Sequence, residues 1–164
     1  MEDILNNPGG RTLSRGYAGN WADTSTHIAV TRKNENAAVI DYGIAVARGA
    51  ANDTCKVITA DADKVAGISV RHVTAPYNPT TGEVAYRQYD TVPLARFGRI
   101  LVTALENATE GDQVLFITAQ GGKLGSTTGG AAGAGRVAVP GARWAETVVA
   151  GAVGVIEINM LGAN

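Results

Sequence analysis

Apolar and polar side chains alternate along much of the chain from residue 37 onward. Near the end of the sequence, Ile156, Ile158 and Met160 alternate with Glu157 and Asn159. Successive side chains of a strand point to opposite faces of its sheet, so this period of two indicates β-strands with one buried face. The pattern predicts strands within six segments, which are residues 37–49, 55–59, 65–73, 98–105, 112–118 and 146–160.

The helical pattern, with apolar residues at positions i, i+3, i+4 and i+7, is not clean in any part of the sequence. The best helical candidate is 45–53, and Gly49 interrupts it. Short strands separated by Gly, Pro and Asn-Asp turns are typical of all-β sandwiches and barrels. We therefore predict an all-β fold in which residues 27–164 form a single β-sandwich or jelly-roll-like domain. The strands show no regular repeat period, which argues against a solenoid.

Residues 1–26 show neither a strand nor a helix pattern. Several glycines interrupt the stretch, and Tyr17 and Trp21 are aromatic residues close together, which is rare in a disordered tail. We predict that these residues form an extended N-terminal arm. The arm lies either on its own domain or on a neighbouring molecule.

Two long segments are predicted as loops. Residues 74–90 are rich in Tyr and Pro, and we interpret them as an excursion from the sheet. Residues 121–135 contain seven glycines in fifteen positions, so we expect a flexible loop, or one that is ordered only against a partner.

The acidic stretch 106–112 separates two apolar runs. Glu106, Glu110 and Asp112 are polar, and Gly111 can adopt the positive φ that many turns require. Paired carboxylates can also catalyse glycoside cleavage, but a solvated turn accounts for this cluster better. We therefore expect a hairpin turn between two core strands.

Composition excludes several classes of protein. The net charge is −1 and the longest Lys/Arg cluster is Arg32-Lys33, so we expect no nucleic-acid partner. Cys55 is the single cysteine and cannot form an internal disulfide, which fits folding in a reducing cytoplasm. The N-terminal stretch is acidic, so we expect no signal peptide. No apolar run approaches the length of a membrane span, so we expect no membrane partner.

Motifs for catalysis or cofactor binding are weak. Residues 133–138, GAGRVA, match a dinucleotide fingerprint, but Pro140-Gly141 would stop the helix that such a site needs. Asp61 and Asp63 resemble the start of a calcium loop whose later ligands are missing, so a solvated turn is the better interpretation. His27, His72 and Cys55 lack zinc spacing, and no nucleophile elbow nominates a serine. We predict no enzymatic activity, no cofactor and no metal site.

The order of the features resembles the structural cement, or capsid decoration, proteins of tailed bacteriophages. An aromatic, Gly-rich arm precedes glycine-led strands and a GDQV turn. The resemblance covers roughly residues 17–160, and its elements in chain order are GYAGNWAD, DYGIAVARG, VAGISVRHV, YDTVPLARFGRILV, EGDQVLF, VPGARW and GVIEINM.

This resemblance implies a small jelly-roll-like β-sandwich that binds the outer surface of a phage head. Such a protein would join neighbouring major capsid subunits, stabilise the expanded shell and be synthesised in the bacterial host cytoplasm. No catalytic residues carry over from the family. We expect the major capsid protein as the partner, and a homo-dimer or homo-trimer because closed symmetry is the usual solution.

The arm supplies the candidate contact residues. Tyr17 and Trp21 would be aromatic anchors, and Arg11 and Arg15 would carry charge to the partner. Alternatively, Trp21 packs on its own domain. The rival function is a carbohydrate-binding or host-attachment module with the same sandwich body. Such a module usually has a groove rich in Trp and Tyr, whereas the two Trp residues of this chain lie far apart in the sequence.

Overall fold

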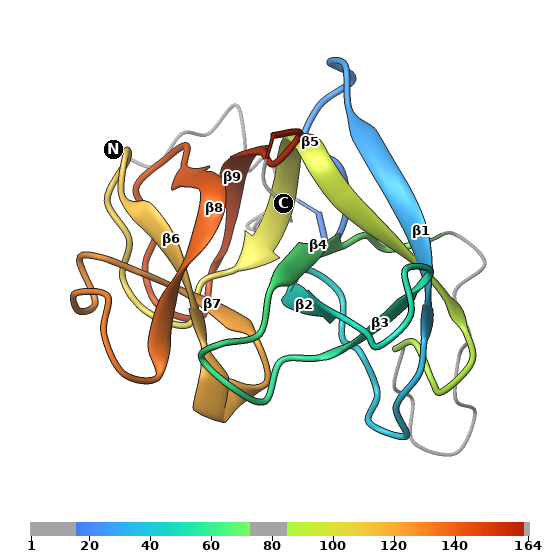
Figure 1. Cartoon of the computed structure of the whole chain (residues 1–164). Helices are drawn as coiled ribbons and strands as arrows, with labels where there is room; N and C mark the ends of the chain where they lie inside the picture. Colours follow the sequence, from blue (N-terminus) through green and yellow to red (C-terminus); the bar gives the residue numbers. More distant parts are fainter. Residues whose placement is uncertain (1–15, 73–84, 163–164) are drawn as a thin grey trace.

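The computed structural model describes residues 16–72 and 85–162. Within these ranges the protein is built from strands, and its only helix is a short 3-10 turn, Thr118–Gln120 (Figure 1). The all-β prediction is therefore confirmed. The nine strands are β1 (Ile28–Asn34), β2 (Ala45–Arg48), β3 (Thr54–Val57), β4 (Val65–Ser69), β5 (Thr91–Thr103), β6 (Gln113–Ile117), β7 (Lys123–Ser126), β8 (Arg136–Trp144) and β9 (Val153–Asn159).

The strands form one continuous sheet in the order β1-β3-β2-β4-β5-β9-β8-β6-β7, and this sheet closes on itself. An additional pairing of β1 with β5 closes the first five strands into a first barrel. Beyond β5, a bridge between Ala104 and Leu124 brings β7 back to the end of β5 and closes a second barrel. The two barrels lie side by side and share β5 (Figure 1). The predicted sandwich or jelly roll, which would stack two separate sheets, is not confirmed.

Each of the six predicted segments contains at least part of a strand. The alternation in β9 is confirmed, because Ile156 and Ile158 are buried whereas Glu157 and Asn159 are exposed. Three strands were not predicted. In β1 most side chains are exposed, β7 is four residues long and includes Gly125, and β8 contains Pro140-Gly141, so none of them shows a clear apolar alternation.

Strand β5 connects the two barrels, because its first half contributes side chains to one hydrophobic core and its second half to another. Val92 and Leu94 belong to a small core inside the first barrel, which also contains Cys55. Ile100 and Val102 belong to a large core, which fills the second barrel and reaches the outer side of β2 and β4. The bulkiest residue of the large core is Trp144, whose indole N–H donates to the carbonyl of Gly125 at 3.1 Å.

The turn in the acidic stretch is present, but it does not make a hairpin. The amide of Asp112 donates to the carbonyl of Thr109 at 3.0 Å, and Gly111 has a φ of 89°. The strands on its two sides, β5 and β6, are not neighbours, because β9 and β8 lie between them. The hairpin prediction is therefore wrong. Apolar alternation marks strands but does not reveal which strand is the neighbour.

Segments 104–112 and 144–152 instead repeat the same structure and bind each other about a local two-fold axis. Ala108 and Val148 exchange both backbone hydrogen bonds at 2.8 Å. Gly111 donates to Trp144 at 2.8 Å, and Gly151 donates to Ala104 in the same way. The side chains follow the same symmetry: Asn107 accepts from the amide of Ala150, and Thr147 accepts from the amide of Glu110. The sequence analysis found no repeat because few residue types are shared by the two segments.

The segment 121–135 is not simply a loop, since it contains β7, which pairs with β6. The turns that follow β7 are held by Arg136. Its guanidinium donates to both carboxylate oxygens of Glu106, at 2.5 and 2.6 Å, and to the carbonyls of Ser126 and Gly130. Glycine is required near this pair because a Cβ on Gly129 would lie 2.0 Å from the Glu106 carboxylate. Three of the seven glycines, Gly125, Gly129 and Gly130, therefore pack closely against this ion pair.

Candidate interaction surface

The described part of the N-terminal segment lies along β5 of its own domain. Gly19 donates to the carbonyl of Leu101 at 2.7 Å, and the amide of Leu101 donates back to Asn20 at 2.8 Å. Ala22 then donates to Arg99 at 2.9 Å. These bonds follow β5 as an added strand would. They place residues 16–22, which we call the strap, over Leu101, which would otherwise expose an apolar side chain on the outer face of the sheet.

The two predicted aromatic anchors differ in their surroundings. Trp21 is partly buried, packs against the large core and stacks on the ring of His27, with ring centroids 4.1 Å apart. Tyr17 is 62% exposed, and the Arg71 guanidinium lies 4.5 Å from the centre of its ring. The strap therefore offers Tyr17 to solvent and uses Trp21 within the domain. The other two predicted contact residues, Arg11 and Arg15, lie outside the described residues.

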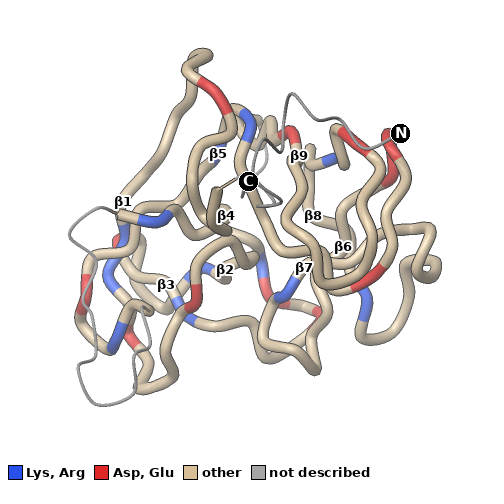
Figure 2. The backbone as a smooth tube through the Cα atoms, turned by 180° about the vertical axis from the view of Figure 1, so that it is seen from behind, with Lys and Arg blue, Asp and Glu red and all other residues tan. Residues whose placement is uncertain are grey.

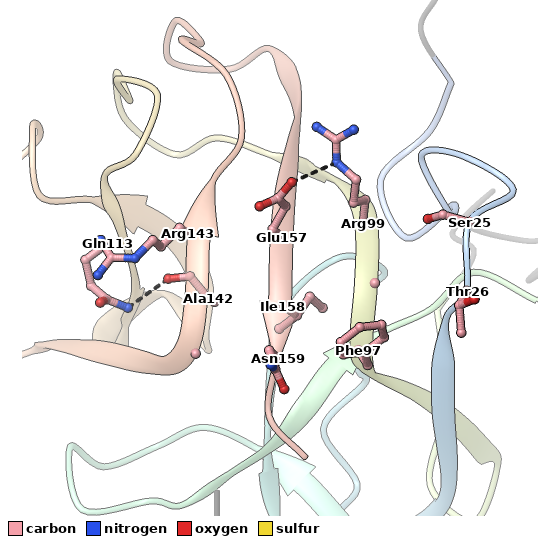
Figure 3. Close-up of a pocket in the computed structure, with 12 residues that line it drawn as sticks. Ser25, Thr26, Phe97, Arg99, Gln113, Ala142, Arg143, Glu157, Ile158 and Asn159 are labelled. Carbon is pink, nitrogen blue, oxygen red and sulfur yellow. Dashed lines mark hydrogen bonds and ion pairs between the residues drawn. The ribbon is translucent and has the colours of Figure 1, made fainter. Parts of the chain in front are cut away.

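Below the strap, a groove of about 630 Å³ opens on the outer face of β5, β9 and β8 (Figure 3). Phe97 is half-buried and supplies apolar side-chain surface, whereas Ala142 and Ile158 line the groove with side chains that are buried in the large core. Polar side chains form the rim, with Ser25 on one side and Gln113 on the other. The residues that line the groove are Ser25, Thr26, Phe97, Gly98, Arg99, Gln113, Gly141, Ala142, Arg143, Glu157, Ile158 and Asn159.

Two glycines in the lining of the groove occupy positions where neighbouring residues of the protein leave no room for a side chain. A Cβ on Gly141 would lie 2.0 Å from the carbonyl oxygen of Asn159. A Cβ on Gly98 would lie 2.9 Å from the Cβ of His27. Both glycines also have positive φ, at 65° and 121°, which side-chain-bearing residues rarely adopt. The close approach of backbone therefore shapes this surface.

A row of charged side chains crosses the groove. In the strand register Arg99 of β5 lies opposite Glu157 of β9, and Glu157 lies opposite Arg143 of β8. The Arg99 guanidinium lies 3.2 Å from the Glu157 carboxylate and 3.6 Å from that of Asp23. Hydrogen bonds from Ser25 and the charge of Arg99 hold the pKa of Asp23 below its usual value. This row places charged side chains side by side at the outer surface.

The amide of Gln113 fixes the far rim of the groove. Its Nε2 donates to the carbonyls of Val139 and Ala142, both at 2.9 Å. These carbonyls flank Pro140-Gly141, where the register between β6 and β8 shifts and some backbone groups lose their partner in the ladder. A side chain therefore replaces the missing backbone bonds and keeps the groove wall in place.

The side chains singled out for chemistry do not assemble into a reactive site. Burial raises the pKa of the Cys55 thiol to about 11, which disfavours the nucleophilic thiolate. Asp61 accepts from Thr118 and from the amide of Gly135, and Asp63 accepts from two backbone amides of its own turn. Residues 133–138 form a turn leading into β8, where a dinucleotide site would need a helix. Among the described residues, no group of three His, Cys, Asp or Glu side chains could hold a metal ion.

Basic and acidic positions are interspersed over the backbone of both barrels (Figure 2). No helix in the described ranges is long and apolar enough to cross a membrane.

The sequence did not predict the groove itself. The alternation had placed Arg99 opposite the buried Ile100 and Glu157 beside the buried Ile156, so their outward direction was readable. The sequence did not reveal that β5 and β9 are neighbours in the sheet.

Comparisons with known proteins identify the family of the chain. The sequence matches the model of a protein family described as structural cement protein (E217 gp24/Pam3 gp6) over residues 5–160. A search of curated proteins gave no significant match.

Solved structures that the chain matches include one of similar fold and one weaker match. A chain from the capsid of Myoviridae phage XM1 is 22% identical, with a TM-score of 0.70, and the match covers 94% of this chain and 96% of that chain. The N base of the head fiber gp8.5 of bacteriophage phi29 is a weaker match, with a TM-score of 0.40, 13% identity, and coverage of 82% of this chain and 95% of that chain. Because the family model spans nearly the whole sequence, the protein belongs to the structural cement protein family of bacteriophages.

Proposed function

We propose that this protein binds the outer surface of a phage head and joins neighbouring major capsid subunits, so that it stabilises the expanded shell. The observation that carries the proposal is the outer groove, an apolar floor with a charged and polar rim, in a chain of the structural cement family. Apolar centres with polar rims are typical of protein–protein interfaces. In this proposal the chain acts by surface burial and is no enzyme.

The arrangement of the strap supports a division of roles near the N-terminus. Tyr17 is exposed and would contact the partner, as would Arg11 and Arg15. Trp21 packs within its own domain and would hold the strap in place. A stable contact would bury about 1,200–2,000 Å² in total, and many copies on one lattice would add avidity. We further propose a symmetric homo-dimer or homo-trimer on the outside of the virion, after synthesis in the host cytoplasm.

The test is co-sedimentation of the purified protein with expanded, undecorated heads of its own phage. We expect saturable pelleting at a fixed ratio to the capsid subunit. Decorated heads should also retain their DNA to a higher temperature than undecorated heads. A double variant, Arg11→Ala with Arg15→Ala, tests the proposed arm contacts and should bind more weakly than the wild type. Failure of the wild-type protein to pellet would overturn the cement function.

The rival function is distinguished by a parallel assay. A glycan-binding module would bind an array of host surface oligosaccharides and would not saturate at a fixed ratio to capsid subunits. Glycan sites usually stack sugar rings on aromatic side chains, and the lining of this groove includes a single aromatic residue, Phe97. The composition of the groove therefore favours a protein partner.

A further inference from the structure

Among the described residues, one of the two cations of the groove has no ion-pair partner. The lining contains two guanidinium groups, Arg99 and Arg143, and one carboxylate, Glu157. Arg99 lies between two carboxylates, at 3.2 Å from Glu157 and 3.6 Å from Asp23, so its charge is compensated. The remaining cation is Arg143, at the opposite side of the groove (Figure 3).

The surroundings of Arg143 leave its charge available. The side chain is exposed, and its Nη1 donates to the backbone carbonyl of Gly111 at 3.1 Å. Within the described ranges, no carboxylate lies within ion-pair distance of it, although Glu157 is its neighbour across the strands. Arg99 holds that carboxylate instead. The carbonyl bond orients the guanidinium at the rim, and a planar guanidinium offers further N–H groups in the fork geometry that suits a carboxylate.

The rest of the groove fits a polypeptide. The half-buried ring of Phe97 can contact an apolar side chain, and Ser25, Thr26 and Asn159 supply hydrogen-bonding groups along the edges of the groove. A partner segment that supplies one carboxylate would give Arg143 an ion-pair partner without displacing the pairs that Arg99 makes with Glu157 and Asp23.

We propose that this groove binds an acidic loop of the major capsid protein, with an Asp or Glu carboxylate of that loop paired with Arg143. This inference rests on the proposed cement function and names the partner chemistry of the same surface. Arg143 is then a specificity-determining residue. Because the pair forms at an open rim, its strength depends on the ionic strength of the solution.

The experiment measures the affinity for expanded, undecorated heads by co-sedimentation, for the wild type and three variants. Arg143→Glu reverses the charge, and Arg143→Gln removes it without placing a second carboxylate beside Glu157. Arg87→Glu is the matched control, since Arg87 is also exposed and lies outside the groove. The melting temperature of each variant is measured first to establish that it folds.

We expect binding to be at least tenfold weaker for Arg143→Glu, weaker by a smaller factor for Arg143→Gln, and within twofold of the wild type for Arg87→Glu. Wild-type affinity should fall with added NaCl, and the two Arg143 variants should show a shallower salt dependence. Capsid variants selected to restore binding of Arg143→Glu should replace an Asp or Glu on the shell surface with Lys or Arg.

Every other outcome overturns either the acidic-loop inference or the proposed cement function. If the wild type pellets and both Arg143 variants bind as it does, the inference is wrong and the cement function stands. The inference is also wrong if wild-type binding is insensitive to salt, or if Arg87→Glu is as damaging as Arg143→Glu. If the wild type does not pellet, the proposed function fails, and the acidic-loop contact fails with it.

Discussion

At the scale of single residues, the strap separates two aromatic side chains that look alike in the sequence. Trp21 packs against the large core and on His27, whereas Tyr17 points into solvent beside Arg71. Removing a partly buried Trp loses apolar contact and leaves a void, and removing an exposed Tyr loses only its contact with a cation. Substitution of Trp21 should therefore affect mainly the stability of the fold, and substitution of Tyr17 should affect mainly the binding to phage heads.

We expect Trp21→Ala to lower the free energy of unfolding by about 2 kcal/mol and Tyr17→Ala to lower it by less than about 1 kcal/mol. Urea denaturation followed by far-UV circular dichroism measures both. In the head-binding assay the order should reverse, with Tyr17→Ala the weaker binder among folded variants. Equal destabilisation by the two substitutions would contradict the packing described for the strap.

A second prediction at this scale concerns acid stability. The hydrogen bonds and charge of Arg136 hold the pKa of the Glu106 carboxyl below its usual value. A carboxyl whose pKa is lowered by folding stabilises the fold above its unfolded pKa and loses that contribution as the pH falls through the folded pKa. The pair should therefore stabilise the protein at pH 7 and cease to do so in acid, below a pH of about 4.

The change that tests this is Glu106→Gln. It should lower the free energy of unfolding at pH 7 by about 1–2 kcal/mol, as expected for a partly buried ion pair. The difference from the wild type should shrink as the pH falls from 5 to 3. Denaturation at several pH values measures it, and Glu110→Gln, which removes an exposed carboxylate, is the control. A difference that does not depend on pH would exclude the ion pair as the cause.

At the scale of elements, the two related segments 104–112 and 144–152 are equivalent parts of one structure. Each contains a glycine with positive φ, at 89° for Gly111 and 82° for Gly151, and each glycine donates to the other segment at 2.8 Å. A Cβ at either position would meet nothing within 4 Å. The cost of a side chain there is therefore the cost of the backbone conformation alone.

Gly111→Ala and Gly151→Ala should each destabilise the protein by about 1–2 kcal/mol, the cost of a left-handed residue with a Cβ. The two values should agree within about 0.5 kcal/mol because the local structures match. Gly141→Ala provides a contrast, since its Cβ would also meet the Asn159 carbonyl oxygen at 2.0 Å, and it should cost more than either. Unequal costs at positions 111 and 151 would refute the local two-fold relation.

At the scale of the whole molecule, the two barrels are joined by more than a linker. Strand β5 contributes Val92 and Leu94 to the small core and Ile100 and Val102 to the large core. The large core also includes Ala45 and Ala47 of β2, so it crosses from the second barrel to the first. One barrel cannot unfold without removing a strand and apolar contacts from the other. We therefore expect the protein to unfold as one cooperative unit.

Two natural probes report on the two cores. Cys55 lies in the small core and Trp144 in the large core, and both side chains are almost fully buried. In a Trp21→Phe background, the thiol reactivity of Cys55 and the fluorescence of Trp144 should change at the same denaturant concentration. Labelling of Cys55 at a lower concentration than the fluorescence change would show that the first barrel opens independently.

The outward positions of β5 and β9 show how much the sequence revealed. Alternation around Ile100 and Ile156 predicted the strands, their buried faces and the exposed Arg99 and Glu157, because the period of two is a property of neighbouring residues. The order of the sequence features along the chain, from the aromatic arm to the last strand, indicated the cement protein family. The all-β class followed from the absence of a helical period.

The sequence by itself therefore determined the all-β class, the alternation of β9 and the family. Only the tertiary structure decided that one sheet closes into two barrels, that the strap covers Leu101, and that Arg99, Glu157 and Arg143 form one row across a groove. The physical reason is that alternation depends on adjacent residues, whereas strand pairing and charge balance depend on residues that are distant in the chain. Arg143 and Gly111, for example, meet only because β8 returns to lie beside β6.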